Sequence, residues 1–189
     1  MKQIFLIGDS IREGYCEKVK EALRDRAEVI YPGENCRTSQ YIVMRMLPWS
    51  ELCRKEDVAV VHVNCGQWDA GHMNGTPEPL TSLTEYRKNL HSIIWELEKF
   101  FPQAQIILAT TTPMNPAHPE TINPRTTGEI VEYNRILKEV AREKNLPVND
   151  LFEESQDWGE EFYLDYCHMT EEGYSRLAKK VTRAVSAYL

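Results

Sequence analysis

The sequence predicts an α/β protein, a three-layer α/β/α sandwich in which about five parallel strands lie between two layers of helices. Short β-rich runs alternate with helical patterns from one end of the chain to the other. Parallel strands need such crossover helices between them. The 189 residues contain no internal repeat and no linker-like stretch, which predicts one domain over residues 1–189.

The strands are predicted from short β-rich runs that stop at turn residues. The first run stops at Gly8, the second stops at Pro32-Gly33, and the third, VAVVHV, is the most clearly buried. In chain order the predicted strands are Lys2–Ile7, Ala27–Tyr31, Val58–Val63, Gln105–Thr111 and Pro147–Phe152.

The helices are predicted from apolar residues at helical spacing. The pattern is clearest between Ser82 and Phe101, Pro48 is expected to kink its helix, and Thr170 suits the N-cap of the last one. The predicted helices are Arg12–Arg26, Ser39–Arg54, Ser82–Phe101, Thr126–Lys144 and Thr170–Leu189.

Polar segments and two long loops lie at one edge of the predicted sheet. Four polar segments each come directly after a predicted strand: Gly8–Ser10, Gly33–Ser39, Asn64–Asp69 and Thr110–Pro113. The loops Asn64–Leu80 and Thr112–Arg125 leave from the same edge, and loops longer than ~12 residues are uncommon without a function. Because ligands of such sheets bind beyond the carboxyl ends of the strands, a site is predicted there.

Composition and charge exclude several classes of protein. The net charge of −7 argues against binding to nucleic acid or to an anionic membrane, and no apolar run approaches the ~18 residues of a membrane span. The five cysteines are an odd number without a CxxC pair, which fits neither a disulfide framework nor a zinc site. The apolar stretch at the N-terminus is too short for a signal peptide. The predicted compartment is therefore the cytoplasm.

Two segments at opposite ends of the chain carry side chains for nucleophilic catalysis. Ser10 follows the first strand directly, but a serine hydroxyl is a poor nucleophile until a base removes its proton. The segment Asp165-Tyr166-Cys167-His168 stands just before the last helix. Its three-residue spacing lets the carboxylate fix the imidazole tautomer while the other ring nitrogen faces the serine. Neither motif is specific alone, since Ser10 also suits a helix N-cap and Asp165 with His168 a loop hydrogen bond.

The combination of GDS on the first strand, DxxH before the last helix and Gly173-Tyr174 after it resembles the SGNH (GDSL-like) hydrolase superfamily. The resemblance covers nearly the whole chain and implies a flavodoxin-like α/β/α fold. It also implies that Ser10 is the nucleophile, His168 the general base and acid, and Asp165 its orienting partner. Members include esterases, lipases, thioesterases and carbohydrate deacetylases. No cofactor is expected for this chain.

The motifs for the oxyanion hole depart from the family pattern. By spacing, Cys36 stands where the family usually carries a glycine that donates its backbone N–H, and Gly33 is the weaker alternative. The third family motif, GxND, corresponds to Gly66-Gln67-Trp68-Asp69, so Trp68 replaces the asparagine. Either Asn64, which ends the strand and is preferred, or Gln67 is expected to supply the amide. NxGxWD and the later TTTP resemble a bacterial subgroup of the family in which the third motif is altered.

Further polar and aromatic residues in the two long loops are candidates for contact with substrate, or for ordinary loop packing. They are Trp68, Asp69, His72, Asn115, His118 and Arg125. Cys167 is a weaker alternative nucleophile. No set of residues has metal-ligand spacing and no phosphate-binding glycine motif is present, so neither a metal nor a nucleotide is expected.

The predicted function is hydrolysis of a small ester with a short acyl group, acetyl first, with an O-acetylated carbohydrate as the expected substrate class. The predicted oxyanion donors are Ser10, Cys36 and Asn64. Three alternatives remain: a thioesterase or lysophospholipase of the same family, a non-catalytic binding protein on the same scaffold, and a flavin or nucleotide binder suggested by the fold pattern alone.

Overall fold

The computed structural model describes residues 1–119 and 122–189. In this part of the chain, five parallel strands form one sheet in the order β2-β1-β3-β4-β5. The strands are β1 (Gln3–Gly8), β2 (Glu28–Ile30), β3 (Val58–Asn64), β4 (Gln105–Ala109) and β5 (Val148–Asn149). The predicted fold class is confirmed.

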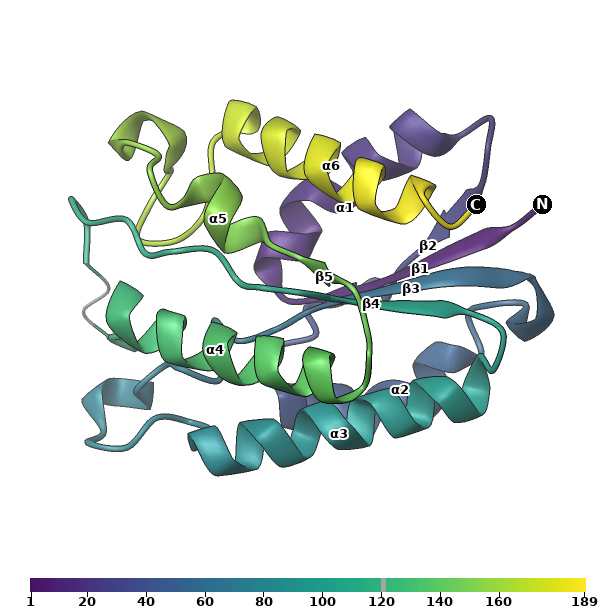
Figure 1. Cartoon of the computed structure of the whole chain (residues 1–189). Helices are drawn as coiled ribbons and strands as arrows, with labels where there is room; N and C mark the ends of the chain where they lie inside the picture. Colours follow the sequence, from purple (N-terminus) through teal and green to yellow (C-terminus); the bar gives the residue numbers. More distant parts are fainter. Residues whose placement is uncertain (120–121) are drawn as a thin grey trace.

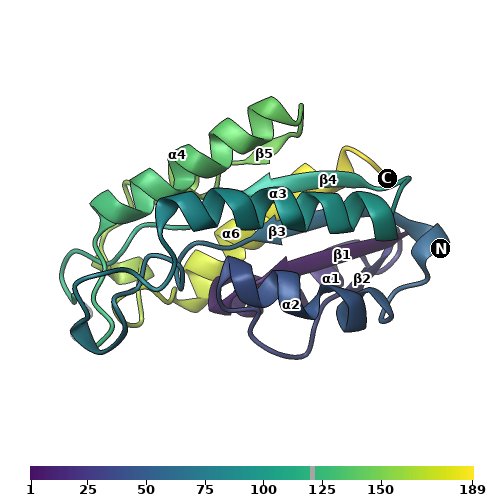
Figure 2. The same cartoon turned by 90° about the horizontal axis from the view of Figure 1, so that it is seen from below.

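Helices cover both faces of the sheet (Figure 1). The helices are α1 (Ser10–Leu23), α2 (Ser39–Ser50), α3 (Leu83–Phe100), α4 (Thr127–Glu143), α5 (Leu151–Ser155) and α6 (Glu171–Ser186). Short 3₁₀ turns occupy Lys55–Asp57, Met73–Gly75 and Glu160–Phe162. Helices α2, α3 and α4 lie on one face, and α1, α5 and α6 lie on the other (Figures 1 and 2). None of the described helices is long and apolar enough to cross a membrane.

Alternation along the central strands divides the core into two halves. On β1, Phe5 and Ile7 pack with α2, α3 and α4, while Ile4 and Leu6 pack with α1 and α6. All four side chains are fully buried. At Gly14 on α1, a Cβ would come within 2.1 Å of the Tyr174 ring on α6, so the close contact of these helices requires glycine there. Both faces of the sheet are thus packed against helices.

The fifth strand differs from the prediction of Pro147–Phe152. Strand β5 contains only Val148 and Asn149, and α5 begins at Leu151. The reason is Asp150, whose side chain caps α5 by accepting a hydrogen bond from Glu153 N–H at 3.1 Å. The second predicted helix also ends early, at Ser50 rather than Arg54, and α2 includes Pro48.

The register places three strand ends side by side. Gly8 of β1 pairs with Asn64 of β3, which in turn pairs with Ala109 of β4. The segments that follow these strands therefore begin at the same level of the sheet. This edge carries the candidate site.

Candidate active site

The serine of the GDS motif stands at a tight corner between β1 and α1. A Cβ at Gly8 would lie 2.6 Å from Arg12 Cβ and 3.0 Å from the Asn64 carbonyl, so only glycine fits. Asp9 is the N-cap of α1, and its Oδ1 accepts a hydrogen bond from Ile11 N–H at 3.0 Å. Ser10 is therefore the first residue of the helix, at the carboxyl edge of the sheet.

The segment before α6 folds into a turn around the Asp165 carboxylate. Asp165 Oδ1 accepts hydrogen bonds from the backbone N–H groups of Cys167 at 2.9 Å and His168 at 2.8 Å. Burial raises the pKa of Asp165, but these bonds and the His168 ring outweigh it and hold the pKa below its ordinary value. Asn115 Nδ2 donates to the Asp165 carbonyl at 3.0 Å and ties the turn to the loop after β4.

Ser10, His168 and Asp165 form one hydrogen-bonded row. His168 Nδ1 lies 2.7 Å from Asp165 Oδ2, and His168 Nε2 lies 2.9 Å from Ser10 Oγ. The two ends of the chain thus meet at one rim of the sheet. Such a row can move a proton from a hydroxyl to an imidazole that a carboxylate holds in the correct tautomer.

Beside this row lies a cavity of about 200 Å³. Of the residues predicted to contact substrate, Trp68 and Arg125 line its wall. Other wall residues were not among those predicted to contact substrate: Asn35, Gly71, Met73, Asn123 and Tyr166. Asn35, Gly71, Met73 and Asn123 stand in segments that connect a strand to the next helix, and Tyr166 stands in the turn before α6, so position in the chain is the signal that could have found them.

Asp69 and Asn115, both predicted to contact substrate, have structural partners instead. Asp69 is fully buried, and its carboxylate accepts hydrogen bonds from both the N–H and the hydroxyl of Ser39 at the start of α2. Burial raises its pKa to about 6. Asn115 is also buried and holds the turn at Asp165, and His118 is exposed outside the cavity wall.

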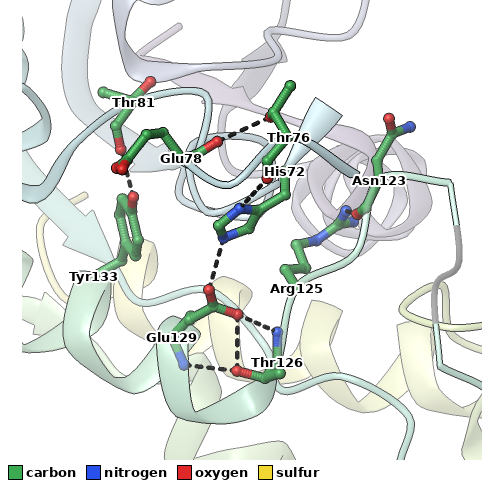
Figure 3. A network of polar contacts seen from close by, with 9 residues as sticks. All are labelled: His72, Thr76, Glu78, Thr81, Asn123, Arg125, Thr126, Glu129 and Tyr133. Carbon is green, nitrogen blue, oxygen red and sulfur yellow. Dashed lines mark hydrogen bonds and ion pairs between the residues drawn. The ribbon is translucent and has the colours of Figure 1, made fainter. Parts of the chain in front are cut away.

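His72 likewise has structural partners rather than a place in the cavity wall (Figure 3). Its Nδ1 lies 2.8 Å from the Thr76 carbonyl and its Nε2 lies 2.8 Å from Glu129 Oε1. Glu129 also caps α4 by accepting hydrogen bonds from the N–H and hydroxyl of Thr126. His72 thus joins the loop after β3 to the first turn of α4.

We expect His72→Gln to lower the melting temperature most near pH 5.5. The Thr76 carbonyl and Glu129 raise the pKa of His72 from 6.5. The stability that the protonated imidazole contributes to the folded protein is therefore complete below pH 6.5 and is lost as the pH rises through the raised pKa. Burial raises the pKa of Glu129, but hydrogen bonds from Thr126 and His72 outweigh it and hold the pKa below 4.5. The stability that the ionised carboxylate contributes is therefore complete above pH 4.5 and is lost toward lower pH. Circular dichroism melts at pH 5.5 and 8.5 measure this, with the exposed His118→Gln as control. An equal loss at both pH values would contradict the ion pair.

Two donors predicted for the oxyanion hole are engaged elsewhere. Cys36 N–H donates to the Gly8 carbonyl at 3.1 Å, and Asn64 Nδ2 donates to the Thr110 carbonyl at 3.2 Å. Both residues are fully buried and neither lines the cavity. The buried Arg12 guanidinium, which no sequence motif indicates, holds the segment that contains Cys36 by donating to the carbonyls of Gly8 at 3.3 Å and Glu34 at 2.6 Å. Both donors are therefore bonded to carbonyl groups of the protein itself in this conformation.

Cys167 is unsuited to be the nucleophile. Burial raises the pKa of its thiol to about 12, so the thiolate is scarce at neutral pH. Cys167, Asp165 and His168 also place possible metal-ligating atoms within 4.8 Å of one another. However, the carboxylate and imidazole already bond each other, and the thiol lies 3.6 Å from the Arg125 guanidinium, which repels a cation.

With the fold and the site described, comparison with known proteins defines the class of this protein, an esterase of the SGNH type. The model of the GDSL-like lipase/acylhydrolase family matches residues 6–176. The chain belongs to this family, whose members hydrolyse ester substrates.

Curated and solved relatives agree with this assignment. A GDSL esterase/lipase of Arabidopsis thaliana is 30% identical over 210 residues, covering 95% of this chain and 86% of that protein. The structure resembles the acetyl xylan esterase AlAXEase with a TM-score of 0.77, at 23% identity over 97% of this chain and 99% of the other. It also resembles Est24, a carbohydrate acetylesterase from Sinorhizobium meliloti, with a TM-score of 0.76, at 13% identity over all of both chains.

Proposed function

We propose that this esterase uses Ser10 as nucleophile, His168 as general base and acid, and Asp165 to orient the imidazole. The observation that carries the proposal is the unbroken row from Asp165 Oδ2 through His168 to Ser10 Oγ, with contacts of 2.7 and 2.9 Å. A base within hydrogen-bond reach of a hydroxyl, itself oriented by a third group, is the geometry of an activated nucleophile.

The reaction follows from this arrangement in two halves. Ser10 Oγ bonds to the ester carbon while its proton moves to His168 Nε2, and the carbonyl electrons pass to oxygen. The bond to the alcohol then breaks, the alcohol takes the proton from His168, and an acyl-serine remains. Water, deprotonated by His168, repeats the steps and releases the acid. The Ser10 N–H, in the first turn of α1 where N–H groups lack a helical acceptor, is proposed to donate to the oxyanion.

The proposed substrate is a short acyl ester, acetyl first, on a carbohydrate. The cavity of about 200 Å³ is smaller than the ~300–1,000 Å³ of sites for drug-sized ligands. Its wall combines the rings of Trp68 and Tyr166 with the amides of Asn35 and Asn123, which suits the apolar faces and hydroxyl groups of a sugar. The two acetylesterases among the structural relatives point to the same class. The cytoplasm belongs to the proposal as well, since five free thiols fit a reducing compartment.

A panel of substrates tests the proposal. We expect kcat/KM to fall by ~10-fold or more from p-nitrophenyl acetate to the octanoate, because each added methylene must force the packed cavity wall apart. Acetylated xylan is expected to release acetate. A rate that rises with chain length, or that is highest for palmitoyl-CoA, would instead indicate a lipase or thioesterase. Absence of hydrolysis of every ester would indicate a binding protein.

A further inference from the structure

The oxyanion that forms at Ser10 requires more than one hydrogen-bond donor, and two of the predicted donors already bond to other groups of the protein. Acyl transfer depends on preorganised donors aimed at the developing negative charge. The Cys36 N–H and the Asn64 amide are buried and bonded to carbonyl groups of the protein. Any additional donor must therefore be a group that lines the cavity.

Arg125 is a cation in the wall of that cavity, together with Ser10 and His168. Three contacts fix its guanidinium: Nε donates to Gln67 Oε1 at 2.9 Å, Nη1 to the Asn123 carbonyl at 3.1 Å, and Nη2 to Cys167 Sγ at 3.6 Å. Its Cζ also lies 5.3 Å from the centre of the Tyr166 ring. A guanidinium has five N–H groups, so one on each terminal nitrogen has no acceptor among residues 1–119 and 122–189.

No carboxylate in the described part of the chain lies within ion-pair distance of Arg125. Burial raises the pKa of Asp9, but the guanidinium is close enough to that buried carboxylate to lower the pKa in part. Glu129, four residues further along the chain, turns instead to His72 and Thr126 (Figure 3). The Asp165 carboxylate is engaged by His168 and by backbone N–H groups. A half-buried guanidinium of this kind suits an anionic group that arises in the cavity.

We propose that Arg125 donates to the oxyanion of the tetrahedral intermediate at Ser10 and so supplies the charge stabilisation that Cys36 and Asn64 do not. The inference rests on the function proposed above. When Ser10 Oγ bonds to the ester carbon, the carbonyl electron pair moves to oxygen and the guanidinium faces that new negative charge. When the C–O bond to the alcohol breaks, the charge returns to the carbonyl.

Gln67 is a positioning residue in this arrangement. It is buried, and its amide bridges the Thr112 carbonyl at 2.7 Å and Arg125 Nε at 2.9 Å. The bridge fixes the plane of the guanidinium, and Trp68, the next residue, lines the same cavity. The Gln67-Trp68 pair, in which Trp68 stands in place of the asparagine of the family motif, thus belongs to the same arrangement as Arg125.

Steady-state kinetics on p-nitrophenyl acetate tests the proposal. Arg125→Met, which keeps much of the stem but removes every donor, is expected to lower kcat by about 10²–10³-fold with KM within about threefold of wild type. Arg125→Lys keeps the charge but not the planar set of donors, so its kcat is expected to lie between those of wild type and Arg125→Met. The control, Arg24→Met, removes the same charge from the exposed end of α1 and should leave kcat unchanged. The inhibition constant of phenylboronic acid, which forms a tetrahedral adduct on serine, should rise in parallel with the loss in kcat/KM.

Each outcome separates this inference from the proposed function. If Ser10→Ala is inactive while Arg125→Met keeps kcat within about threefold of wild type, Arg125 does not stabilise the oxyanion. A raised KM at unchanged kcat would also overturn the inference, since it indicates equal binding of ground and transition states. If Arg125→Met does not fold, as judged by its melting curve, Arg125→Lys decides the question by the same two criteria. Activity retained by Ser10→Ala would overturn the proposed function itself.

Discussion

Ser10→Ala is expected to lower kcat on p-nitrophenyl acetate by about 10⁴–10⁶-fold. The change removes the atom that bonds to the ester carbon and the hydroxyl that lies 2.9 Å from His168 Nε2. It leaves the helix intact, because Asp9 still caps α1 and alanine is the best helix former. The expected loss therefore reports chemistry, and the melting temperature should stay within a few degrees of wild type.

Covalent labelling provides a second, independent measurement of Ser10. A fluorophosphonate reacts only with an activated serine, so wild type should gain one adduct on the peptide that contains Ser10, and Ser10→Ala should gain none. Ser92→Ala, an exposed serine on α3, is the matched control and should keep both labelling and rate. A Ser10→Ala protein that hydrolyses the ester at near-wild-type rate would exclude Ser10 as nucleophile.

Strands and helices can be predicted from the sequence wherever one hydrophobic or capping pattern dominates. The prediction fails where two such patterns compete. The long helix α3 has apolar residues at helical spacing and a capping box at Ser82 and Glu85, so both its existence and its start are predictable. Around Asp150 the apolar residues favour a strand, but the aspartate and Glu153 three residues later favour a helix start. In the structure Asp150 caps α5, and β5 contains only two residues.

The proximity of Ser10 and His168 also follows from sequence, because two facts of topology suffice. Both residues stand at the carboxyl edge of one parallel sheet, one after the first strand and the other before the last helix. The roles of loop residues require more. Whether Asp69 faces the cavity or Ser39 depends on how the loop after β3 folds back on α2, and no local pattern encodes that path.

The same limit explains the oxyanion donors. Spacing identifies Cys36 and Asn64 as residues near the strand ends, and the register does place Asn64 beside Gly8. The direction of an N–H or an amide is set by partners from distant segments, here the Gly8 and Thr110 carbonyls. Arg125 is held at the cavity wall by Gln67, which belongs to another loop, so the orientation of its guanidinium cannot be predicted from local sequence either.

Asp165→Asn is expected to lower kcat by roughly 10⁴-fold while the protein stays folded. The introduced amide can still accept the two backbone N–H bonds through its Oδ1, so the turn before α6 should survive. The atom that faces His168 Nδ1 then becomes an NH₂ group, a donor where the carboxylate was an acceptor. His168 Nδ1 must accept, its proton moves to Nε2, and the nitrogen beside Ser10 can no longer take a proton.

The control for this tautomer argument is Asp157→Asn, which makes the same chemical change at an exposed position and should keep the full rate. Nuclear magnetic resonance of the imidazole nitrogens provides the direct measurement: in Asp165→Asn the proton should lie on Nε2, and in wild type on Nδ1. A variant that loses the rate but keeps its proton on Nδ1 would show that Asp165 acts through its charge, by stabilising the imidazolium. A variant that keeps the rate would show that the contact of 2.7 Å between Asp165 and His168 has no part in the reaction.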